Sequence, residues 1–461
     1  MDLPQRLIDW MRRSVVGIRF ERWLFRRLFA VVRTVRPVWR LPDRWFLPRI
    51  VRRVVLVTRY RDLHQVLANP KGYSVSGYGS RMRETGADFF LGHDAGPQRA
   101  ADRAAALAAM QGPVRGVVHK IAFDEATRMI EIRRAGLRVE DAGNGTFRRV
   151  PSSGRLDVVA DLADLVPVHV AERYFGLANP GGRQLLEWIQ LTSFYIFNPF
   201  ASDADRRRAL RAGQEMQGHV RRVVEAGSAR SGSVLGRLIA AARSGGAPFG
   251  PAERDAVART ITGLVAGSLG PPPRLFAKAV DRLLDLRGAA GRDLRRAARE
   301  GDSVRVRSYL LEAGRMAPDP VILYRRCTAY DETRAGLDPI VRGGKERAPA
   351  ESTLAGVRLH AGDTVVGLAD SALMDPRSIR SPKRFLLDRP AEERMIFGHG
   401  EHFCVGDGVG MDTLTGMAQP LFALERLRRV RGRRGMLQSG ARGRYPHQNY
   451  PAHLIVRFDP R

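Results

Sequence analysis

The residues best suited to chemistry stand in one glycine-spaced loop, Phe397–Gly406, with the sequence FGHGEHFCVG. It presents Cys404, one of only two cysteines in the 461-residue chain. A cysteine binds metal as the thiolate, so its pKa must be pulled below about 8.5 by a metal, a cation or the N–H groups at a helix start. The pattern predicts that Cys404 is a metal ligand just before a helix.

The side chains around Cys404 suit a large, flat ligand. The glycines let the backbone approach such a group without a Cβ in the way, and Phe397 and Phe403 can keep water from the sulfur. His402 can reach a carboxylate on the ligand. A lone cysteine fits no tetrahedral zinc or iron–sulfur site, whereas haem iron takes a single axial thiolate. The alternative is an inert, buried cysteine in a glycine-rich turn.

This loop resembles the haem-binding signature of the cytochrome P450 family, Phe-Gly-x-Gly-x-(basic)-x-Cys-x-Gly, at every position. The resemblance implies the cytochrome P450 fold, which is mainly α with small β-sheets (α+β), and haem b (iron protoporphyrin IX) as cofactor. It implies that Cys404 ligates the iron and that Phe397, His402 and Gly406 help to bind the cofactor. The resemblance covers about residues 54–458.

Arginines upstream are candidates for holding the haem propionates. Gly96-Pro97 opens an alanine-rich segment that predicts a helix with proline in its first turn. Arg99 and Arg103 are four residues apart and share one face of that helix. Family members have His or Trp and then Arg at this spacing, and Arg also forms bidentate pairs with carboxylates. Arg325 matches a propionate-binding arginine on a later strand. A solvated charged face is the alternative for the helical pair.

Residues 252–286 are expected to form the long helix that crosses the haem face, and here the chain departs from the family. The family pattern Ala-Gly-x-(Asp/Glu)-Thr supplies an acid and an alcohol that deliver protons to dioxygen. This chain has Ala266-Gly267-Ser268-Leu269-Gly270, followed by three prolines and Arg274. Because interior proline costs about 3 kcal/mol or more, we expect the helix to break near Gly270 and to restart at the prolines. Ser268, Gly270 and Arg274 are the candidate catalytic residues on the oxygen side.

Loss of the acid and the alcohol bears on the oxidant. A peroxide already carries its electrons and most of its protons, so the site suits a peroxide or the rearrangement of a substrate hydroperoxide. Fatty-acid peroxygenases of the family also lack the pair, and they place Arg and Pro there to hold a carboxylate, a role open to Arg274. The competing interpretation is that Ser268 or ordered water replaces the relay in an ordinary monooxygenase.

A structural ion network is also implied by the resemblance. Glu312 and Arg315 lie on one face of a predicted helix. In the family, this Glu-x-x-Arg pair joins the arginine of a later Pro-x-Arg-Phe, which is Arg384 here, in a buried network behind the haem-binding loop. Cys327 has no partner cysteine and is expected in the core.

The remaining elements are predicted from periodicity, composition and their place in the family's order. They are a strand at 54–58, a helix at 62–67, a loop or hairpin at 140–154, an apolar helix at 157–177, an aromatic substrate roof at 185–200, a helix at 405–428 and a strand at 453–458.

Charge and cysteine content limit the partners. The net charge of +29 comes from 72 arginines and only 5 lysines, scattered along the chain and often beside acids. No nucleic-acid-binding signature accompanies them, so we expect no nucleic-acid partner and favour an acidic electron donor of the ferredoxin type. Two cysteines give no disulfide framework, which indicates a reducing, cytoplasmic setting.

Residues 46–461 are expected to form a single haem-binding domain, and residues 1–45 a basic, amphipathic N-terminal extension. The apolar runs of the extension are too short to span a bilayer and no signal peptide is evident. Two interpretations remain: a helix lying peripherally on the anionic inner membrane face, or an arm packed on its own domain.

These features together predict a haem-thiolate oxidoreductase that hydroxylates an apolar or fatty-acid-like substrate, using dioxygen with redox partners or using peroxide. Two alternatives stay open. One is an isomerase or dehydratase of hydroperoxides, and the other is a haem-binding protein without oxygenase activity.

Overall fold

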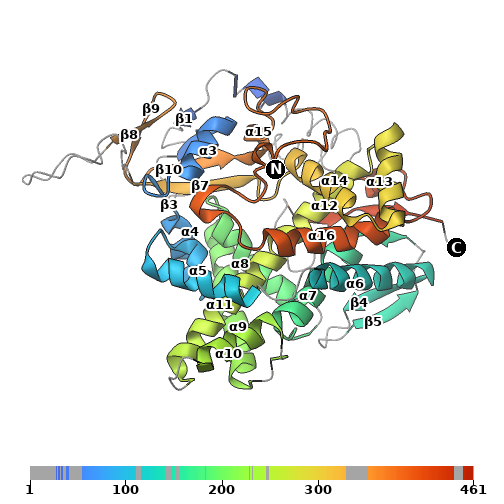
Figure 1. The fold of residues 1–461 in the computed structure, drawn as a ribbon, viewed down its shortest axis with the longest axis horizontal. Coiled ribbons are helices and arrows are strands. Elements are labelled where there is room, and N and C mark those ends of the chain that lie inside the picture. The colour runs from blue at the N-terminus through green and yellow to red at the C-terminus, as the bar shows by residue number, and fades with distance from the viewer. Residues whose placement is uncertain are drawn as a thin grey trace, which may run out of the picture.

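Helices make up most of the molecule, and short sheets lie along its edges (Figure 1). The structure is a computed structural model. It describes residues 27–28, 30–31, 33–34, 38–40, 54–110, 116–141, 147–151, 155–181, 183–227, 229–230, 232–244, 249–328, 351–440 and 450–459.

The largest sheet has five strands in the order β1-β2-β10-β7-β3. Their bounds are Val38–Arg40 (β1), Val54–Val57 (β2), Tyr73–Ser74 (β3), Ile322–Cys327 (β7) and Thr364–Leu368 (β10). Strand β10 runs parallel to β2 and antiparallel to β7. The β-branched residues of β2 are almost completely buried, which suits a strand covered on both faces. Helix α3 (Tyr60–Ala68) follows, so the predicted strand–helix pair is confirmed.

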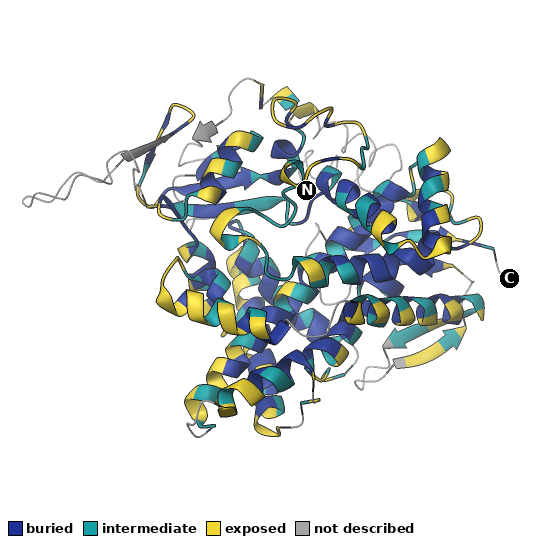
Figure 2. Ribbon diagram, viewed as in Figure 1, coloured by how far each residue is buried: buried dark blue, intermediate teal, exposed yellow. Residues whose placement is uncertain are grey.

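The helices pack into one body around a large apolar core (Figure 2). Their bounds are Ser76–Glu84 (α4), Pro97–Met110 (α5), Val117–Arg134 (α6), Val166–Val170 (α7), Gln184–Phe197 (α8), Asp203–Glu225 (α9), Val234–Ser244 (α10), Pro251–Leu269 (α11), Pro271–Leu283 (α12), Gly288–Glu300 (α13), Ser303–Met316 (α14), Ala369–Ala372 (α15) and Asp407–Phe422 (α16). The predicted helices that begin near Pro97 and after Cys404 are confirmed as α5 and α16.

The predicted break in the long helix is also confirmed. Helix α11 ends at Leu269 and α12 begins at Pro271, with Gly270 between them. The Gly270 N–H still donates to the Ala266 carbonyl at 2.9 Å. The prolines stand in the first turn of α12, where a missing N–H leaves no helical hydrogen bond unmade.

Helix α16 lies directly against α6. A Cβ added to Gly416 would come within 2.6 Å of the His119 carbonyl oxygen, so only glycine permits this approach. Helix α16 is therefore held closely against α6, and Cys404 stands immediately before it.

Small elements complete the fold. The segment around residues 140–154 contains the hairpin β4 (Leu137–Asp141) and β5 (Phe147–Pro151). The segment 157–177 is helical and largely buried, with π-helical turns at Val158–Ala163 and Ala171–Phe175 on either side of α7. The remaining strands are β6 (Leu156–Asp157), β8 (Glu351–Leu354), β9 (Val357–His360), β11 (Arg428–Arg429), β12 (Gln438–Ser439), β13 (Pro451–His453) and β14 (Ile455–Arg457).

The N-terminal segment is described only in part, and residues 1–26 lie outside the described ranges. Its described residues contact the domain. Arg33 is buried and donates from Nη1 to the Ser371 carbonyl oxygen at 2.6 Å, and β1 pairs with β2. Across the described residues, every helix is too short or too polar to traverse a bilayer.

Cys327 lies on β7 and is 1% exposed in a smaller core cluster between the sheet and α3. Its predicted place in the core is confirmed.

Candidate functional site

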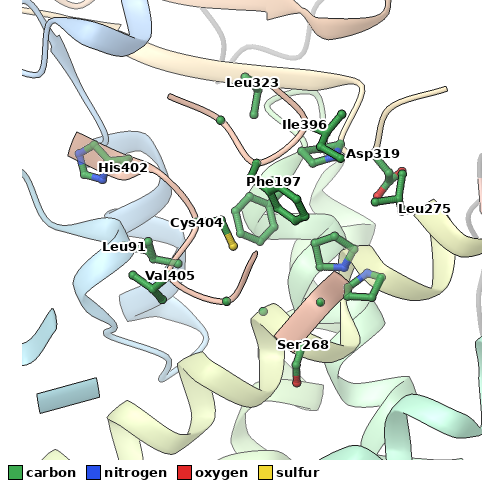
Figure 3. A pocket seen from close by; sticks show the side chains of 18 of the residues that line it. Leu91, Phe197, Ser268, Leu275, Asp319, Leu323, Ile396, His402, Cys404 and Val405 are labelled. Atoms are coloured by element: carbon green, nitrogen blue, oxygen red, sulfur yellow. The ribbon is translucent and has the colours of Figure 1, made fainter. Parts of the chain in front are cut away.

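Cys404 lies on the wall of an interior cavity between α11–α12 and the loop that precedes α16 (Figure 3). Most of the lining is apolar, including Phe89, Leu264 and Leu275. The volume open to the centre of a water molecule is ≈ 240 Å³, whereas one water needs only about 10–15 Å³ by that measure. The cavity therefore has room for a large organic group beside the sulfur.

The backbone of the loop is shaped by its glycines. Gly398 and Gly400 have φ values of 76° and 71°, a region that side chains with a Cβ avoid. At Gly400 a Cβ would also lie 2.6 Å from the Leu67 carbonyl oxygen, which fixes the loop against the end of α3. The Cys404 N–H donates to the Phe397 carbonyl oxygen at 3.0 Å. These contacts place the sulfur in the cavity.

The environment of Cys404 favours the neutral thiol in the absence of a metal. Burial raises the pKa of the thiol to about 11, although a hydrogen bond from the Gly406 N–H opposes this shift and Asp407 adds to it. Helix α16 begins three residues later, at Asp407. Within the described ranges, no group of three or more His, Cys, Asp or Glu side chains is placed to hold a metal ion. Cys404 would therefore act as a single protein ligand, and it would need the metal itself to ionise.

His402 lines the same cavity, and both of its ring nitrogens are buried without a hydrogen-bond partner. Burial, together with the positive charges of Arg325 and Arg99, lowers the pKa of this imidazole to about 3. Buried polar atoms are almost always hydrogen-bonded in native proteins. Two unpartnered nitrogens on a cavity wall therefore indicate a polar group of a bound ligand.

Arginines approach this side of the cavity from two elements. Arg325, on β7, lines it, is 7% exposed and donates from Nη1 to the Tyr324 carbonyl oxygen at 2.8 Å. Arg99, on α5, is buried; its guanidinium pairs with the Glu401 carboxylate, and its Nε is buried without a partner. Arg103 is partly exposed and does not line the cavity. The structure thus brings Arg325 and His402 to the cavity, with Arg99 behind Glu401 and Arg103 further out.

Two of the three candidate catalytic residues, Ser268 and Arg274, line the cavity from α11 and α12, and Figure 3 shows Ser268. Ser268 lines the cavity, and its hydroxyl donates back to the Val265 carbonyl oxygen at 3.0 Å. Arg274 also lines the cavity, and its Nε pairs with Asp319 at 2.7 Å. Gly270 does not line the cavity but is buried against Ser193, where a Cβ would lie 2.8 Å from the hydroxyl oxygen. Gly270 therefore shapes the break between the two helices.

These observations fit a haem group. The sulfur stands alone on an apolar wall, as an axial ligand must. Arg99 Nε and the protonated nitrogen of His402 are unpartnered donors, and carboxylate oxygens accept from such donors. A Cβ added at Gly267, on the facing helix, would meet no atom within 4 Å, so the space across from the sulfur is open.

The overall fold matches solved structures of cytochromes P450. Myxobacterial CYP267B1 in complex with myristic acid superposes with a TM-score of 0.68 at 19% identity, covering 94% of this chain and 96% of that one. The crystal structure of CalO2 superposes with a TM-score of 0.67 at 20% identity, covering 94% of this chain and 96% of CalO2. This likeness establishes the fold.

Sequence relatives extend the likeness. The cyclomarin C epoxidase CymV of Salinispora arenicola is 25% identical over 363 residues, which are 77% of this chain and 80% of that protein. The cytochrome P450 monooxygenase PikC of Streptomyces venezuelae is 24% identical over 357 residues, which are 77% of this chain and 73% of PikC. No protein-family model matches the chain. The chain has the cytochrome P450 fold and is similar in sequence to these proteins over 77% of its length.

Another relative shares a shorter region with this chain. The linoleate diol synthase of Gaeumannomyces graminis is 26% identical over 210 residues, or 43% of this chain. The chain spans only 18% of the length of that relative. The relatives that match over most of their own length are an epoxidase and a monooxygenase, which are both oxidoreductases.

The buried ion network around Glu312 has a different third member from the one predicted. Arg315 pairs with Glu312 at 2.8 Å, and both side chains are fully buried. Arg389, and not Arg384, completes the network, with its Nε 2.9 Å from Glu312 Oε1. The chain turns at Ser381 (φ 43°), so the Arg384 side chain is exposed and only its carbonyl oxygen accepts a bond from Arg389.

Several residues of the site escaped sequence reasoning. Glu401, the variable residue before the basic position of the loop, pairs with Arg99. Asp319, Lys278 and Tyr450 surround Arg274. Asp319 lies between Pro318 and Pro320, and the proline that follows restricts its backbone conformation. This restriction was the feature of the sequence that could have marked Asp319 as a site residue. Tyr450 lies far from Arg274 in the sequence, and no local pattern marked it as a site residue.

Proposed function

We propose that this cytochrome P450 is a haem-thiolate monooxygenase that inserts oxygen into an apolar or fatty-acid-like substrate. The observation that carries the proposal is the Cys404 sulfur on an apolar cavity wall, beside the unpartnered nitrogens of His402. The cofactor would be haem b, whose propionates supply the carboxylates that these nitrogens lack. When bound, the haem supplies the redox chemistry of oxygen insertion.

The residues on the thiolate side would bind and orient the cofactor. Cys404 would ligate the iron, while Phe397 and Gly406 line the cavity next to it. His402 and Arg325 would bind one or both propionates directly, and Arg99 would do so from its position beside Glu401. The predicted contribution of Arg103 requires its side chain to turn inward.

The substrate side of the cavity favours an apolar molecule. Its walls include Met82, Phe89, Phe197 and Leu264, and transfer of apolar surface out of water contributes about 25 cal/mol per Å². Phe197 stands at the end of α8, within the segment predicted as the substrate roof. Names of similar proteins support the fatty-acid class, since one acts as a linoleate diol synthase and one binds myristic acid in its crystal structure.

The source of protons in the cavity bears on whether dioxygen or peroxide is the oxidant. The Ser268 hydroxyl already donates to the backbone of its own helix, so we propose that water in the cavity supplies the protons and that dioxygen, with electrons from a ferredoxin-type donor, is the oxidant. Peroxide is the alternative oxidant.

Arg274 is held by Asp319 and Tyr450, and its Nη2 is the guanidinium nitrogen that has no partner among the described residues. We propose that this Nη2 contacts a polar group of the substrate.

A second candidate function is the rearrangement of a fatty-acid hydroperoxide. Two observations favour it: positions 266–270 lack the acid and the alcohol, and a relative is a linoleate diol synthase. This reaction needs neither an electron donor nor protons from solvent. It would use the same cavity and the same cysteine.

The setting of the enzyme is part of the proposal. A chain with two cysteines and a strongly basic surface suits the cytoplasm and an acidic electron donor. Residues 1–45 would make peripheral contact with the inner membrane face, which a vesicle-sedimentation assay comparing the full chain with a truncated chain can measure.

The test is the spectrum of the reduced, carbon-monoxide-bound protein, compared with that of Cys404→His. A thiolate-type spectrum in the wild type that is lost in the variant supports the proposal. Purified protein is then given a fatty acid with a reductase–ferredoxin pair, a fatty acid with hydrogen peroxide, or a fatty-acid hydroperoxide alone. Product from the first arm supports the monooxygenase, and product from the last arm alone supports the rearrangement. A thiolate spectrum without product in any arm, over a broad substrate panel, would indicate a haem-binding protein that lacks oxygenase activity.

A further inference from the structure

Residues at the start of α13 line a second hollow. Helix α13 lies on the opposite side of the molecule from α4 and α5 (Figure 1). We call this second hollow the arginine hollow. No residue lines both this hollow and the Cys404 cavity. Its described lining consists of Leu284, Leu286, Arg287, Gly288, Arg292, Arg295, Leu427, Arg428 and Arg429.

The charges of the arginine hollow are of one sign. Five of the nine lining residues are arginines and none is acidic. Arg429 is neutralised by Asp281 at 2.7 Å and Asp285 at 3.1 Å. In the described part of the chain, the other four arginines form no ion pair. Like charges around one concave surface repel one another, and an anion bound between them would remove that repulsion.

The backbone at the helix start adds to this positive field. The N-cap residue of α13 is Arg287, whose side chain has no acceptor atom. The backbone N–H groups in the first turn of α13 therefore have no side-chain cap. Such N–H groups attract anions. A Cβ added to Gly291 would lie 2.6 Å from the Leu286 carbonyl oxygen, so glycine allows this close turn at the helix start. The same position is 3.5 Å from Arg295 Nη1, which shows that the Arg295 side chain lies back along the helix. The guanidinium of Arg295 is thereby directed toward the helix start.

The dimensions of the hollow limit the class of ligand. The volume open to the centre of a water molecule is ≈ 300 Å³, so a group much larger than a single small ion can enter. Arginine guanidinium groups bind phosphate oxygens in bidentate geometry. We infer that the arginine hollow binds the phosphate groups of an anionic ligand carrying two or more phosphates or a phosphate-bearing headgroup, at a site separate from the haem-thiolate cavity.

The test compares two double variants with equal loss of charge. Arg292→Gln/Arg428→Gln removes two arginines of the hollow. The matched control, Arg207→Gln/Arg211→Gln, removes two exposed arginines of α9 that lie outside the hollow. Inorganic triphosphate is titrated into each holoprotein at physiological ionic strength by calorimetry, and vesicles of phosphatidylcholine with or without phosphatidic acid are used in parallel sedimentation assays.

We expect the hollow variant to lose at least tenfold in affinity for triphosphate or for the phosphatidic acid vesicles, and the control to lose less than twofold. The arm in which binding occurs identifies the source of the phosphate. Equal losses in both variants would show that only the net charge of the protein attracts the anion, and would overturn the inference, as would absence of binding in both arms. Hydrogen exchange at residues 286–291 provides a second readout, because a bound phosphate group would slow exchange there in the wild type alone.

Discussion

Arg274 and Asp319 form an ion pair on the wall of the cavity, with the guanidinium Nε 2.7 Å from the carboxylate Oδ2. Lys278 binds the other carboxylate oxygen at 2.8 Å, and the Tyr450 hydroxyl contacts the same guanidinium. Burial alone would raise the pKa of Asp319, but Arg274 and Lys278 outweigh it and hold that pKa below its ordinary value. The cluster ties α12 to the segment before β7 and so fixes one side of the cavity.

Replacing Asp319 should therefore destabilise the protein strongly. Asp319→Asn leaves two cations without their carboxylate, and removing one partner of a buried pair typically costs about 3–5 kcal/mol. Because the folded pKa of Asp319 is lowered, its contribution is present above the unfolded value near 3.9 and is lost as the pH falls below that value. Urea unfolding at pH 7 and near pH 3 should show that the difference between wild type and variant shrinks in acid.

The exposed pair Asp388–Arg380 supplies the control for this comparison, because its carboxylate is 71% exposed. We expect Asp388→Asn to leave the urea midpoint unchanged. If both substitutions shift the midpoint equally, the Asp319 cluster is not a stabilising feature of the fold.

The buried network around Glu312 gives a second prediction, which separates Arg389 from Arg384. Arg389→Met should strand part of the charge on Glu312, whose side chain is fully buried, at a cost of several kcal/mol and with a loss of folded, haem-containing protein. Arg384→Met changes an exposed side chain and should alter stability by no more than about 0.5 kcal/mol. Soluble yield, urea unfolding and haem content measure both variants. Equal damage from Arg384→Met would restore the residue first predicted from the sequence.

The presence of Arg389 in the network, where Arg384 was predicted, shows which contacts cannot be predicted from the sequence. The helix that begins just after Cys404 and the break at Gly270 were predictable because local rules fix them: glycine spacing, helix starts and the cost of proline inside a helix. Which arginine folds inward depends on the turn at Ser381, and the partner of Arg274 depends on Tyr450 arriving from the far end of the chain. Such contacts depend on the tertiary structure and have no local signature.

His402 gives a third prediction. Its two nitrogens are buried without partners, and leaving polar atoms in that state costs about 1–3 kcal/mol each. A propionate bound there would regain part of this free energy, so His402→Leu should release haem to apomyoglobin roughly tenfold faster than the wild type. His402→Arg, which restores a donor to carboxylates, should retain haem nearly as well as the wild type. Identical release rates for the two variants would remove His402 from the cofactor site.

Ser268 gives the last prediction, which concerns the source of protons. A side chain that acts as general acid typically contributes 10²–10⁴-fold to the rate. The Ser268 hydroxyl instead donates to the Val265 carbonyl oxygen at 3.0 Å, and it stands at the edge of an open space at Gly267 that can hold water. If water supplies the protons, Ser268→Ala should lower dioxygen-driven turnover by less than about tenfold and leave peroxide-driven turnover unchanged. Product formation per electron consumed is measured in parallel, because a lost proton donor would uncouple the two. A fall of a hundredfold or more with dioxygen alone would make Ser268 the proton donor and would exclude the water route.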